Sequence, residues 1–485
     1  MEAAPTRTRP AIRSPQADNR SARSAGAGVP ALARRLDVYG PVVLALYFLA
    51  TTRWGSYVVP GPPYVGDIAI LALLANRTFL VAAGRSGVGV REGTVAVLGG
   101  ALLTWTVIRL IFGEHGIDAA RDVAPYLYAV VAFLVVPLGA GGEARVRKLI
   151  TAALVFHLVW VTATVLLGRL PGAPTLSWVL GGETYVFAIR PDASTFACGL
   201  LAALGVHRAL LGRSPVIHLL LAGWALTVSL AGLSARGSAI AILVQLAIVV
   251  ALSPVRGRER ARSNGAARAR TRRADPRIAV AILVLAVPIG LYAARESGVI
   301  QGIPSGFDPE AARPFEGTSR YAGTATARLR SWDHLAGWIT DDPGRTVIGV
   351  GMGPNYYRDS GGLRLLSTRQ GDDVRAPHNY WLNTWARLGL IGLVLVILLW
   401  VAALSLAVAI VSRPVALRDT DLLAILVAAT LPITATFGVL LESPFGAIPY
   451  FWAVGHLSVR ACQIGAAPSL GSLLRHRERR HPAPR

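Results

Sequence analysis

The sequence has little cysteine and little charge. Two of its 485 residues are cysteine, Cys198 and Cys462, and both fall within apolar stretches. Two isolated thiols exclude a disulfide framework and a zinc site built from several cysteines. Charged residues make up 16% of the chain, whereas 53% of its residues are hydrophobic. This balance excludes an ordinary soluble domain and is typical of a protein that crosses a membrane many times.

Lysine is almost absent as well. Lys148 is the one lysine among 49 basic residues, and the formal net charge is +22. In a soluble protein such a charge would suggest binding to nucleic acid. Here the arginines cluster in segments between apolar stretches, where they report membrane topology and contact with anionic lipid. We therefore expect membrane lipids as neighbours and no nucleic-acid partner.

Twelve apolar stretches predict membrane-spanning helices, since roughly 20 apolar residues span the hydrocarbon core. The second stretch is the weakest, because Asn76 and Arg77 interrupt it. The stretches lie near residues 38–52, 64–83, 94–112, 122–139, 149–168, 193–211, 215–233, 237–252, 278–294, 388–411, 421–440 and 446–464.

The positions of the arginines predict how these helices are oriented. The strongly basic run Arg256–Arg273 and both basic ends of the chain belong in the cytoplasm by the positive-inside rule. The short loops on the other side then hold few arginines, namely Arg53, Arg121, Arg169, Arg190 and Arg236. The predicted fold is an all-α integral membrane protein with about twelve transmembrane helices and both termini inside.

This topology divides the chain into five parts, which differ in composition. They are a disordered basic cytoplasmic tail at 1–37, helices one to nine at 38–294 with a basic cytoplasmic loop at 253–277, a large extracytoplasmic segment at 295–377, helices ten to twelve at 378–464, and a basic cytoplasmic tail at 465–485.

The large outer segment between helices nine and ten is patterned as a partly helical cap. Apolar residues recur at helical spacing over 324–339, which predicts an amphipathic helix. Asp341–Gly344 ends that helix, and the glycines of Gly349–Asn355 predict a tight turn. A segment with these signals folds onto the membrane surface rather than serving as a loose linker.

His378 and Asn379 stand where this cap meets the tenth span. The polar dipeptide leads directly into the apolar residues 388–411, so we expect His378 at the membrane surface. An imidazole there can exchange protons with water, and its pKa is near 6.5 if its surroundings leave it unperturbed.

Several motifs in order resemble the O-antigen ligase and polymerase family of membrane glycosyltransferases, which use polyprenyl-diphosphate-linked donors. The resemblance covers roughly residues 185–400. Its matching positions are an arginine before a helix (Arg190), a Ser-Arg-Gly element (Arg236 and Gly237), an arginine four residues before a tryptophan (Arg328 and Trp332), then Pro343, Gly349, Gly351, Gly353, His378, Asn379, Leu382, Gly389 and Gly392.

The resemblance implies a role for each of these polar residues. His378 would be the catalytic base, and Arg190, Arg236 and Arg328 would bind the donor diphosphate. Guanidinium suits that task because it offers a rigid fork of donors and stays charged when partly desolvated. Further supporting candidates are Asn379, Arg330, which could exchange roles with Arg328, and Glu442.

One position departs from the family pattern. Arg387 stands where the family often carries glutamate, so the charge near His378 is expected to be reversed. Any role for a carboxylate at that position is then in doubt.

The expected function is transfer of a glycan from undecaprenyl diphosphate, or a similar carrier, to an acceptor hydroxyl with inversion at the anomeric carbon. The acceptor would be a lipid-anchored core or another lipid-linked glycan. The site would face the outside of the plasma or inner membrane. No metal or other cofactor is expected, because the pairs Asp341-Asp342 and Asp372-Asp373 lack a third oxygen-rich partner.

The alternative function is transport, for example flipping of lipid-linked oligosaccharides, since twelve spans with both ends inside are common among transporters. A transporter would place polar groups near the bilayer midplane and often shows two similar halves. Here the charged candidates lie at the outer boundary, and no internal repeat is visible.

Overall fold

The computed structural model describes residues 31–50, 57–59, 61–84, 92–167, 175–177, 183–185, 190–232, 236–263, 320–365 and 375–467. This part of the chain is almost wholly helical, which confirms the predicted all-α class. The predicted ninth span at 278–294, most of both terminal tails, and the pair Asp372-Asp373 lie outside the described residues.

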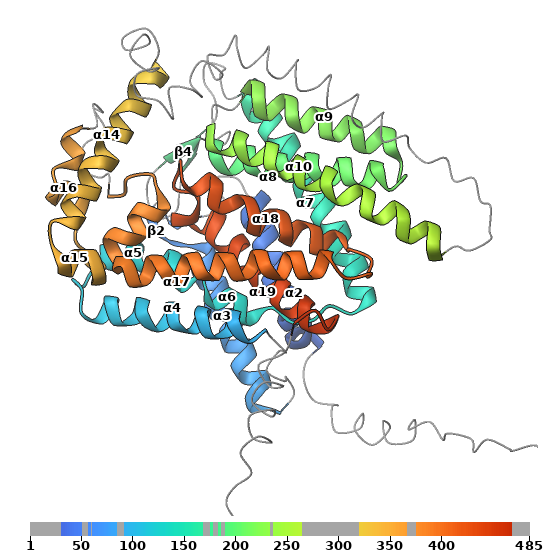
Figure 1. Cartoon of the computed structure of the whole chain (residues 1–485), viewed down its shortest axis with the longest axis horizontal. Coiled ribbons are helices and arrows are strands. Elements are labelled where there is room, and N and C mark those ends of the chain that lie inside the picture. The colour runs from blue at the N-terminus through green and yellow to red at the C-terminus, as the bar shows by residue number, and fades with distance from the viewer. Residues whose placement is uncertain are drawn as a thin grey trace, which may run out of the picture.

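Helices make up the body of the molecule (Figure 1). They are α2 (Ala31–Ala50), α3 (Val65–Ala82), α4 (Gly93–Ile111), α5 (Ile117–Leu127), α6 (Val130–Leu134), α7 (Ala140–Leu167), α8 (Pro191–Leu210), α9 (Pro215–Gly232), α10 (Arg236–Ser263), α14 (Arg320–Thr340), α15 (Pro343–Ile348), α16 (Tyr356–Asp359), α17 (Tyr380–Val411), α18 (Asp419–Ala435) and α19 (Pro444–Gln463), with 3-10 turns η3 (Gly362–Leu365) and η4 (Leu440–Glu442).

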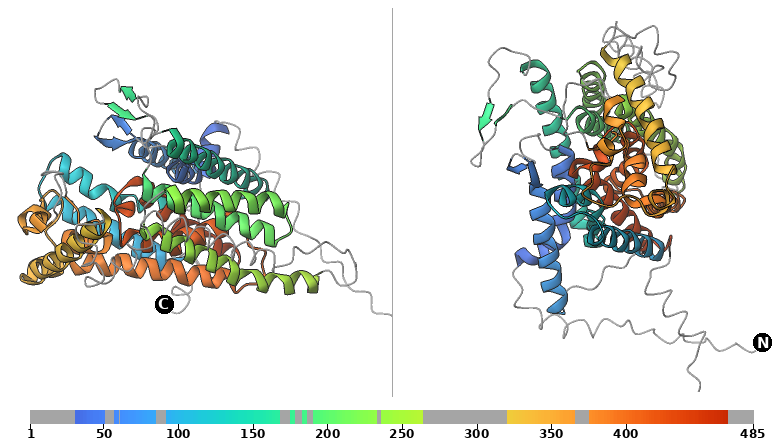
Figure 2. Two further views of the ribbon diagram at one scale, coloured as in Figure 1. Left: turned by 90° about the horizontal axis from the view of Figure 1, so that it is seen from above. Right: turned by 90° about the vertical axis from the view of Figure 1, so that its left-hand side faces the viewer.

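Two short antiparallel hairpins complete the described elements. One pairs β1 (Tyr57–Val59) with β2 (Gly61–Tyr64), and the other pairs β3 (Thr175–Ser177) with β4 (Glu183–Tyr185). Both hairpins lie at the margin of the helical body (Figure 2).

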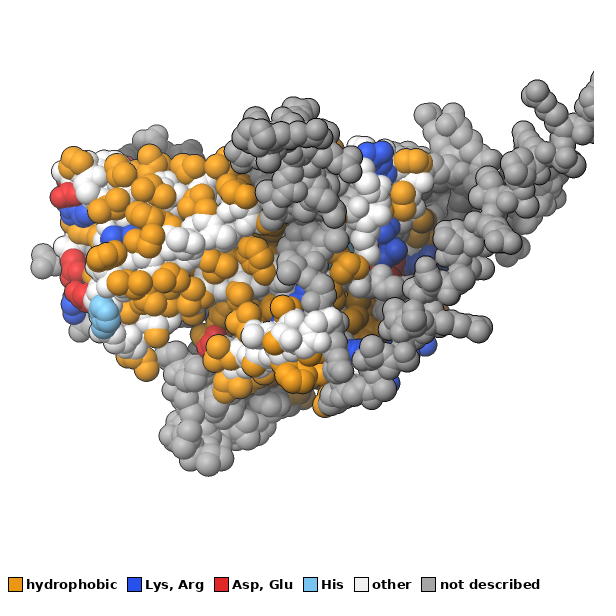
Figure 3. All heavy atoms as spheres, turned by 90° about the horizontal axis from the view of Figure 1, so that it is seen from below, with side chains coloured by type: hydrophobic (Ala, Val, Ile, Leu, Met, Phe, Trp, Pro, Cys, Tyr) orange, Lys and Arg blue, Asp and Glu red, His pale blue; other side chains and the backbone are white. Residues whose placement is uncertain are grey.

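Within the described residues, five helices are both long enough and apolar enough to cross a membrane: α3, α4, α7, α8 and α17. Each of the other predicted spans in this part of the chain overlaps one α-helix, except the fourth, which overlaps two. On the face shown in Figure 3, hydrophobic side chains cover most of the described surface, and charged side chains lie mainly toward its two ends. That distribution is the one expected for helices surrounded by lipid.

The fourth predicted span, at 122–139, is wrong as a single continuous helix. The chain forms α5 and then the short α6, which ends at Leu134. Pro137 accounts for the end of α6, because proline has no backbone N–H to donate to a helical hydrogen bond and disfavours a helical conformation at the residue before it. With 11 residues, α5 is only about 16 Å long, too short to cross the hydrocarbon alone.

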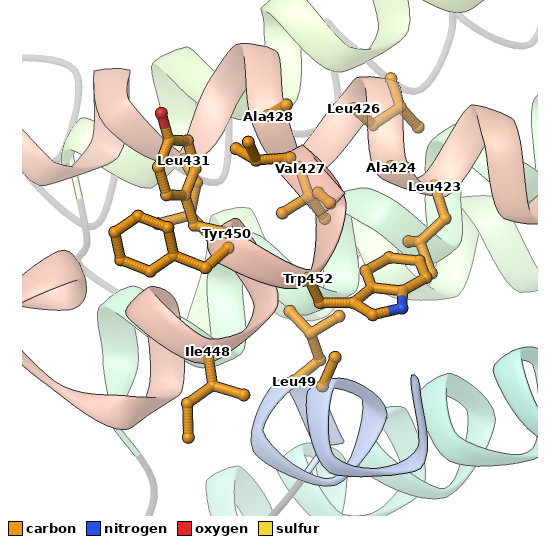
Figure 4. Packing of buried hydrophobic residues seen from close by; sticks show 14 of the residues in the cluster. Leu49, Leu423, Ala424, Leu426, Val427, Ala428, Leu431, Ile448, Tyr450 and Trp452 are labelled. Carbon is orange, nitrogen blue, oxygen red and sulfur yellow. The ribbon is translucent and has the colours of Figure 1, made fainter. Parts of the chain in front are cut away.

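Helices α8, α18 and α19 form the centre of the bundle. Every residue of α19 from Pro444 to Arg460 is buried, and the large indole of Trp452 is 1% exposed. Leu49 of α2 and Leu423 of α18 pack against the same helix (Figure 4). A helix enclosed by protein on all sides need not be apolar all round, so polar side chains can stand along it where they find partners.

The cap lies at the end of the bundle where α17 begins (Figure 1). The apolar face of α14 predicted from sequence is present: Leu335 and Ile339 are fully buried. They pack in a small separate core with Tyr356, Tyr357 and Ala386 of α17. The predicted amphipathic helix is therefore confirmed, and it fastens the cap to the start of α17.

Candidate functional site

The long helix α17 is kinked at Gly389, and part of the cap fills the kink. Gly389 has a φ of +68° inside the helix. The three carbonyl oxygens just before it accept hydrogen bonds from outside α17. These bonds are Val350 N to Ala386 O (2.8 Å), Gly351 N to Arg387 O (3.0 Å) and Trp105 Nε1 of α4 to Leu388 O (2.8 Å).

The motif glycines are required by this insertion. Gly349, Gly351 and Gly353 have φ values of +77°, +87° and +103°, a region that favours glycine. A Cβ on Gly349 would lie 2.5 Å from the carbonyl oxygen of Arg387, and one on Gly353 would lie 2.7 Å from the Cβ of Glu114. The tight turn predicted from GVGMGPN is thus present, and it packs directly on α17.

Hydrogen bonds of its two neighbours, Pro377 and Asn379, hold His378 in place just before α17. The carbonyl of Pro377 accepts a 2.6 Å hydrogen bond from Nε1 of Trp332 on α14. The side chain of Asn379 caps α17 by accepting from Leu382 N at 3.1 Å. Between these two fixed points His378 has a φ of +55°, which is uncommon for any residue other than glycine. Asn379 therefore has a structural task, and His378 is held in a strained backbone conformation of the kind often found at functional sites.

Two arginines and one carboxylate act on His378. The pKa of His378 is lowered to about 4, chiefly by burial and also by the positive charges of Arg328 and Arg190, whereas Asp192 acts to raise it. Among the described residues, none forms a hydrogen bond with the imidazole ring. The ring is therefore neutral at physiological pH and has nitrogens available to a substrate hydroxyl.

Arg190 and Arg328 reach this place from separate elements. Arg190 precedes α8, and its guanidinium carbon lies 4.7 Å from the ring centroid of Phe445. Arg328 is half-buried on α14, and burial lowers the pKa of its guanidinium. It has no hydrogen-bond or ion-pair partner among the described residues, so its donors are available to an anion. Arg330 is exposed and is not among the charges that act on His378, which favours Arg328 over Arg330 as the residue nearest the site.

Arg236 is the first residue of α10, and its side chain lies outside what the structure describes. The next two residues, Gly237 and Ser238, show what the start of α10 contacts. Oγ of Ser238 donates to the carbonyl of Asp192 at 2.8 Å, and Gly237 packs against Phe437. The starts of α8 and α10 therefore lie side by side, at the end of the bundle that carries His378.

Glu442, a weak candidate in the sequence, is a buried acid near the same end. Burial raises the pKa of Glu442 to about 8, although the charges of Arg387 and Arg190 oppose this rise. Its Oε1 is buried without a hydrogen-bond partner among the described residues. The carboxyl group is therefore largely protonated at neutral pH. Asp192, which sequence reasoning missed, is the closer source of negative charge for His378.

The expectation that Arg387 reverses a charge beside His378 is wrong. Arg387 lies about two and a half helical turns further along α17 and is not among the charges acting on the imidazole. Its buried guanidinium pairs with Asp122 of α5 at 2.7 Å and lies 4.8 Å from the ring centroid of Tyr356. Asp122 also accepts from Gly353 N at 3.2 Å and pairs with Arg375 at 3.1 Å. Arg387 thus joins α5, the glycine turn and α17.

This buried pair yields a prediction about stability. Asp122→Ala leaves the Arg387 guanidinium buried without its carboxylate, which we expect to cost about 3–5 kcal/mol of the free energy of unfolding. Adding Arg387→Leu should recover part of that loss, because no charge then remains unpaired. Thermal unfolding of the purified protein measures both effects.

Asp359→Ala is the matched control, since Asp359 pairs with Arg358 at 3.6 Å and both side chains are exposed. Its effect should stay within about 0.5 kcal/mol. If Asp122→Ala and Asp359→Ala unfolded at the same temperature, the buried pair would not stabilise the cap.

Residues 221–397 match the family model described as O-antigen ligase. The matched segment runs from α9 into α17 and contains Arg236, Arg328 and His378, whereas Arg190 and Glu442 lie outside it. No curated protein matches the chain.

Proposed function

Because residues 221–397 match the O-antigen ligase family model, we propose that this multi-pass membrane protein is an enzyme that transfers a glycan from an undecaprenyl-diphosphate-like carrier to an acceptor hydroxyl. The transfer inverts the anomeric carbon and needs no metal. The acceptor is a lipid-anchored core in a ligase or a second lipid-linked glycan in a polymerase.

The observation that carries this proposal is the convergence of Arg190 and Arg328 on His378 at one end of the helical bundle. A diphosphate bridge carries two negative charges at the membrane surface, and two guanidinium groups match them in charge and geometry. The neutral imidazole beside them is a suitable base for a hydroxyl group. The start of α10 supports a third contact, from Arg236, because it adjoins Asp192.

The chemistry follows from these positions. The acceptor oxygen attacks the anomeric carbon on the face opposite the diphosphate, while His378 takes the hydroxyl proton. The bond between the anomeric carbon and the phosphate oxygen breaks, and its electron pair leaves with the diphosphate. Arg190 and Arg328 stabilise the negative charge that grows there, and because they are fixed before the reaction they lower its barrier.

Donor binding also activates the base. In the free protein burial holds the pKa of His378 down, and the charges of Arg328 and Arg190 add to this effect. A bound diphosphate neutralises the two arginine charges, so the pKa of His378 rises by the part that they contribute, while burial continues to lower it. His378 is therefore a stronger base when the donor is present than when the site is empty.

We further propose that the end bearing His378 faces away from the cytoplasm, in a twelve-helix topology with both termini inside. The basic residues at the opposite end support this orientation by the positive-inside rule. They include Arg147, Lys148, Arg208, Arg213 and Arg413.

Cysteine labelling tests the topology. In a background lacking Cys198 and Cys462, we expect an impermeant maleimide added to intact cells to leave Ser263→Cys unmodified. Asp341→Cys, at an exposed position of the cap, should react. Labelling of Ser263→Cys without permeabilisation would overturn the proposed orientation.

The function is tested with purified protein and a defined lipid-linked oligosaccharide. A single addition to the acceptor supports a ligase, and a ladder of products supports a polymerase. If no new glycosidic bond formed and the intact lipid instead moved across a vesicle membrane, the enzyme hypothesis would be wrong and the protein would be a transporter.

A further inference from the structure

A charged hollow lies at the end of the bundle opposite His378. Its volume is about 660 Å³. It opens between the first half of α7, the end of α8 and the start of α9. Its lining residues are Arg147, Lys148, Thr151, Ala152, Val155, Arg208, Arg213 and His218. Helix α18 shows that the hollow and His378 lie at opposite ends of the bundle. It begins beside the hollow, where Asp419 pairs with Arg208, and its other end lies near His378, where Thr436 accepts a hydrogen bond from Trp381.

The hollow carries more positive than negative charge. Arg208, buried at its base, is matched by Asp419 through bonds of 3.0 Å and 2.8 Å and also donates to Thr151. Arg213 reaches the same carboxylate only at 3.8 Å, and its side chain is 46% exposed. Arg147 and Lys148 are exposed and have no acidic partner among the described residues. In the part of the chain that the structure describes, the hollow thus contains four cationic side chains but one carboxylate, that of Asp419.

A second acid in this region, Glu143, does not supply the missing negative charge. Glu143, one turn before Arg147 on α7, is taken by Arg418 at 2.7 Å and by the hydroxyl of Thr420 at 2.7 Å. His218, on α9, faces the hollow with one ring nitrogen 3.1 Å from the carbonyl oxygen of Ser214. The unbalanced charge favours a bound anion with several acceptor oxygens, and phosphate has that chemistry.

The walls beyond the charged residues are apolar. Ala152 and Val155 continue the lining along α7. Next to them Phe156 and Val159 of α7, and Leu220 of α9, present side chains that are 55%, 49% and 69% exposed. A ligand that fits both parts has an anionic head and hydrocarbon chains.

We propose that this hollow binds the phosphate head group of an anionic phospholipid, with its acyl chains along α7 and α9. Arg147, Lys148 and Arg213 contact the phosphate, and Arg208 forms the fixed base that Asp419 and Thr151 hold in place. Basic pockets between membrane helices are known to bind such head groups. The site is separate from the proposed transfer reaction, at the other end of the bundle.

The single lysine makes this proposal directly measurable. An amine-specific acetylating reagent and mass spectrometry report the reaction of Lys148 alone among the side chains. Arg413→Lys adds a reference lysine at an exposed position of the same end, outside the hollow. Both positions are then read in one sample of the full chain in detergent.

We expect phosphatidylglycerol to slow acetylation of Lys148 about tenfold relative to the lysine at position 413, and phosphatidylcholine to change it less than about twofold. The double variant Arg147→Gln/Arg213→Gln should lose this protection. Arg358→Gln, at an exposed position on the cap, should keep it.

Three results would overturn the proposal. Equal slowing at both lysines would mean that anionic lipid gathers over the whole end without a site. Protection that survives Arg147→Gln/Arg213→Gln would place the ligand elsewhere. Equal protection by millimolar inorganic phosphate would assign the hollow to a soluble phosphate rather than to lipid.

Discussion

His378→Ala lowers the turnover of glycan transfer by about 10²–10⁴-fold, the usual contribution of a general base. This is the largest effect we expect from any single substitution. Donor binding should survive the change, because we propose that Arg190 and Arg328, and not His378, bind the diphosphate. A chelator should leave the rate of the unaltered protein unchanged. Turnover and donor affinity, measured separately with a defined lipid-linked donor, test both statements.

The pH dependence of the unaltered protein gives a sharper test of the same role. A base acts only when deprotonated, so the rate falls as the pH drops through its pKa. In the free protein the pKa of His378 is about 4, so kcat/KM should stay level until the pH approaches 4. In the donor complex the arginine charges are neutralised, so the fall in kcat should begin at a higher pH than the fall in kcat/KM, although burial keeps it below the ordinary pKa of histidine.

His115→Ala is the matched control, since His115 is exposed in the turn between α4 and α5. This substitution should leave the pH dependence of both kcat/KM and kcat unchanged. A normal turnover in His378→Ala, with weakened donor binding, would make His378 a binding residue. An acid limb that persists in His378→Ala would assign the titration to another group.

Arg328→Ala should lower transfer by about 10²–10³-fold, the usual cost of removing one donor that stabilises charge in a transition state. Arg328 has no hydrogen-bond or ion-pair partner among the described residues, so its loss should leave the unfolding temperature nearly unchanged. Arg328→Lys should restore little, because an ammonium group lacks the planar fork that binds a diphosphate at two points. The measurements are turnover, donor affinity and thermal unfolding on the same preparations.

Two further variants make this prediction specific. Arg358→Ala, on the exposed side of the cap, should transfer normally. Arg330→Ala tests which of the two arginines has the proposed role, because the sequence allowed either. We expect Arg328→Ala to lower transfer more than Arg330→Ala does. If Arg328→Lys turned over at nearly the normal rate, a two-point contact with the diphosphate would have to be abandoned.

Features encoded within a few residues could be predicted from the sequence. The helical spacing around Trp332 predicted α14 and its buried face, and the glycines after it predicted the turn at 349–355. Both depend on local backbone preferences and on one repeating apolar face, which a short segment displays completely.

Contacts between distant segments could not be predicted in this way. Arg387 looked like a reversed charge beside His378, because its partner Asp122 belongs to a stretch that had been read as part of a transmembrane helix. The low pKa of His378 likewise depends on burial and on Arg190 and Arg328, which come from two other elements. Electrostatics acts through space, so a charge can be interpreted only after its neighbours are known.

The insertion of the glycine turn into the kink of α17 bears on how a lipid-linked substrate arrives. Lifting the turn would leave the carbonyls of the buried residues Ala386 and Arg387 without their hydrogen-bond donors, which costs about 1–3 kcal/mol for each unpaired buried group. We therefore expect the glycine turn to stay packed on α17. If the proposed donor binds at His378, we expect its long polyprenyl tail to enter sideways from the bilayer, between helices, because the glycine turn does not have to move to admit it.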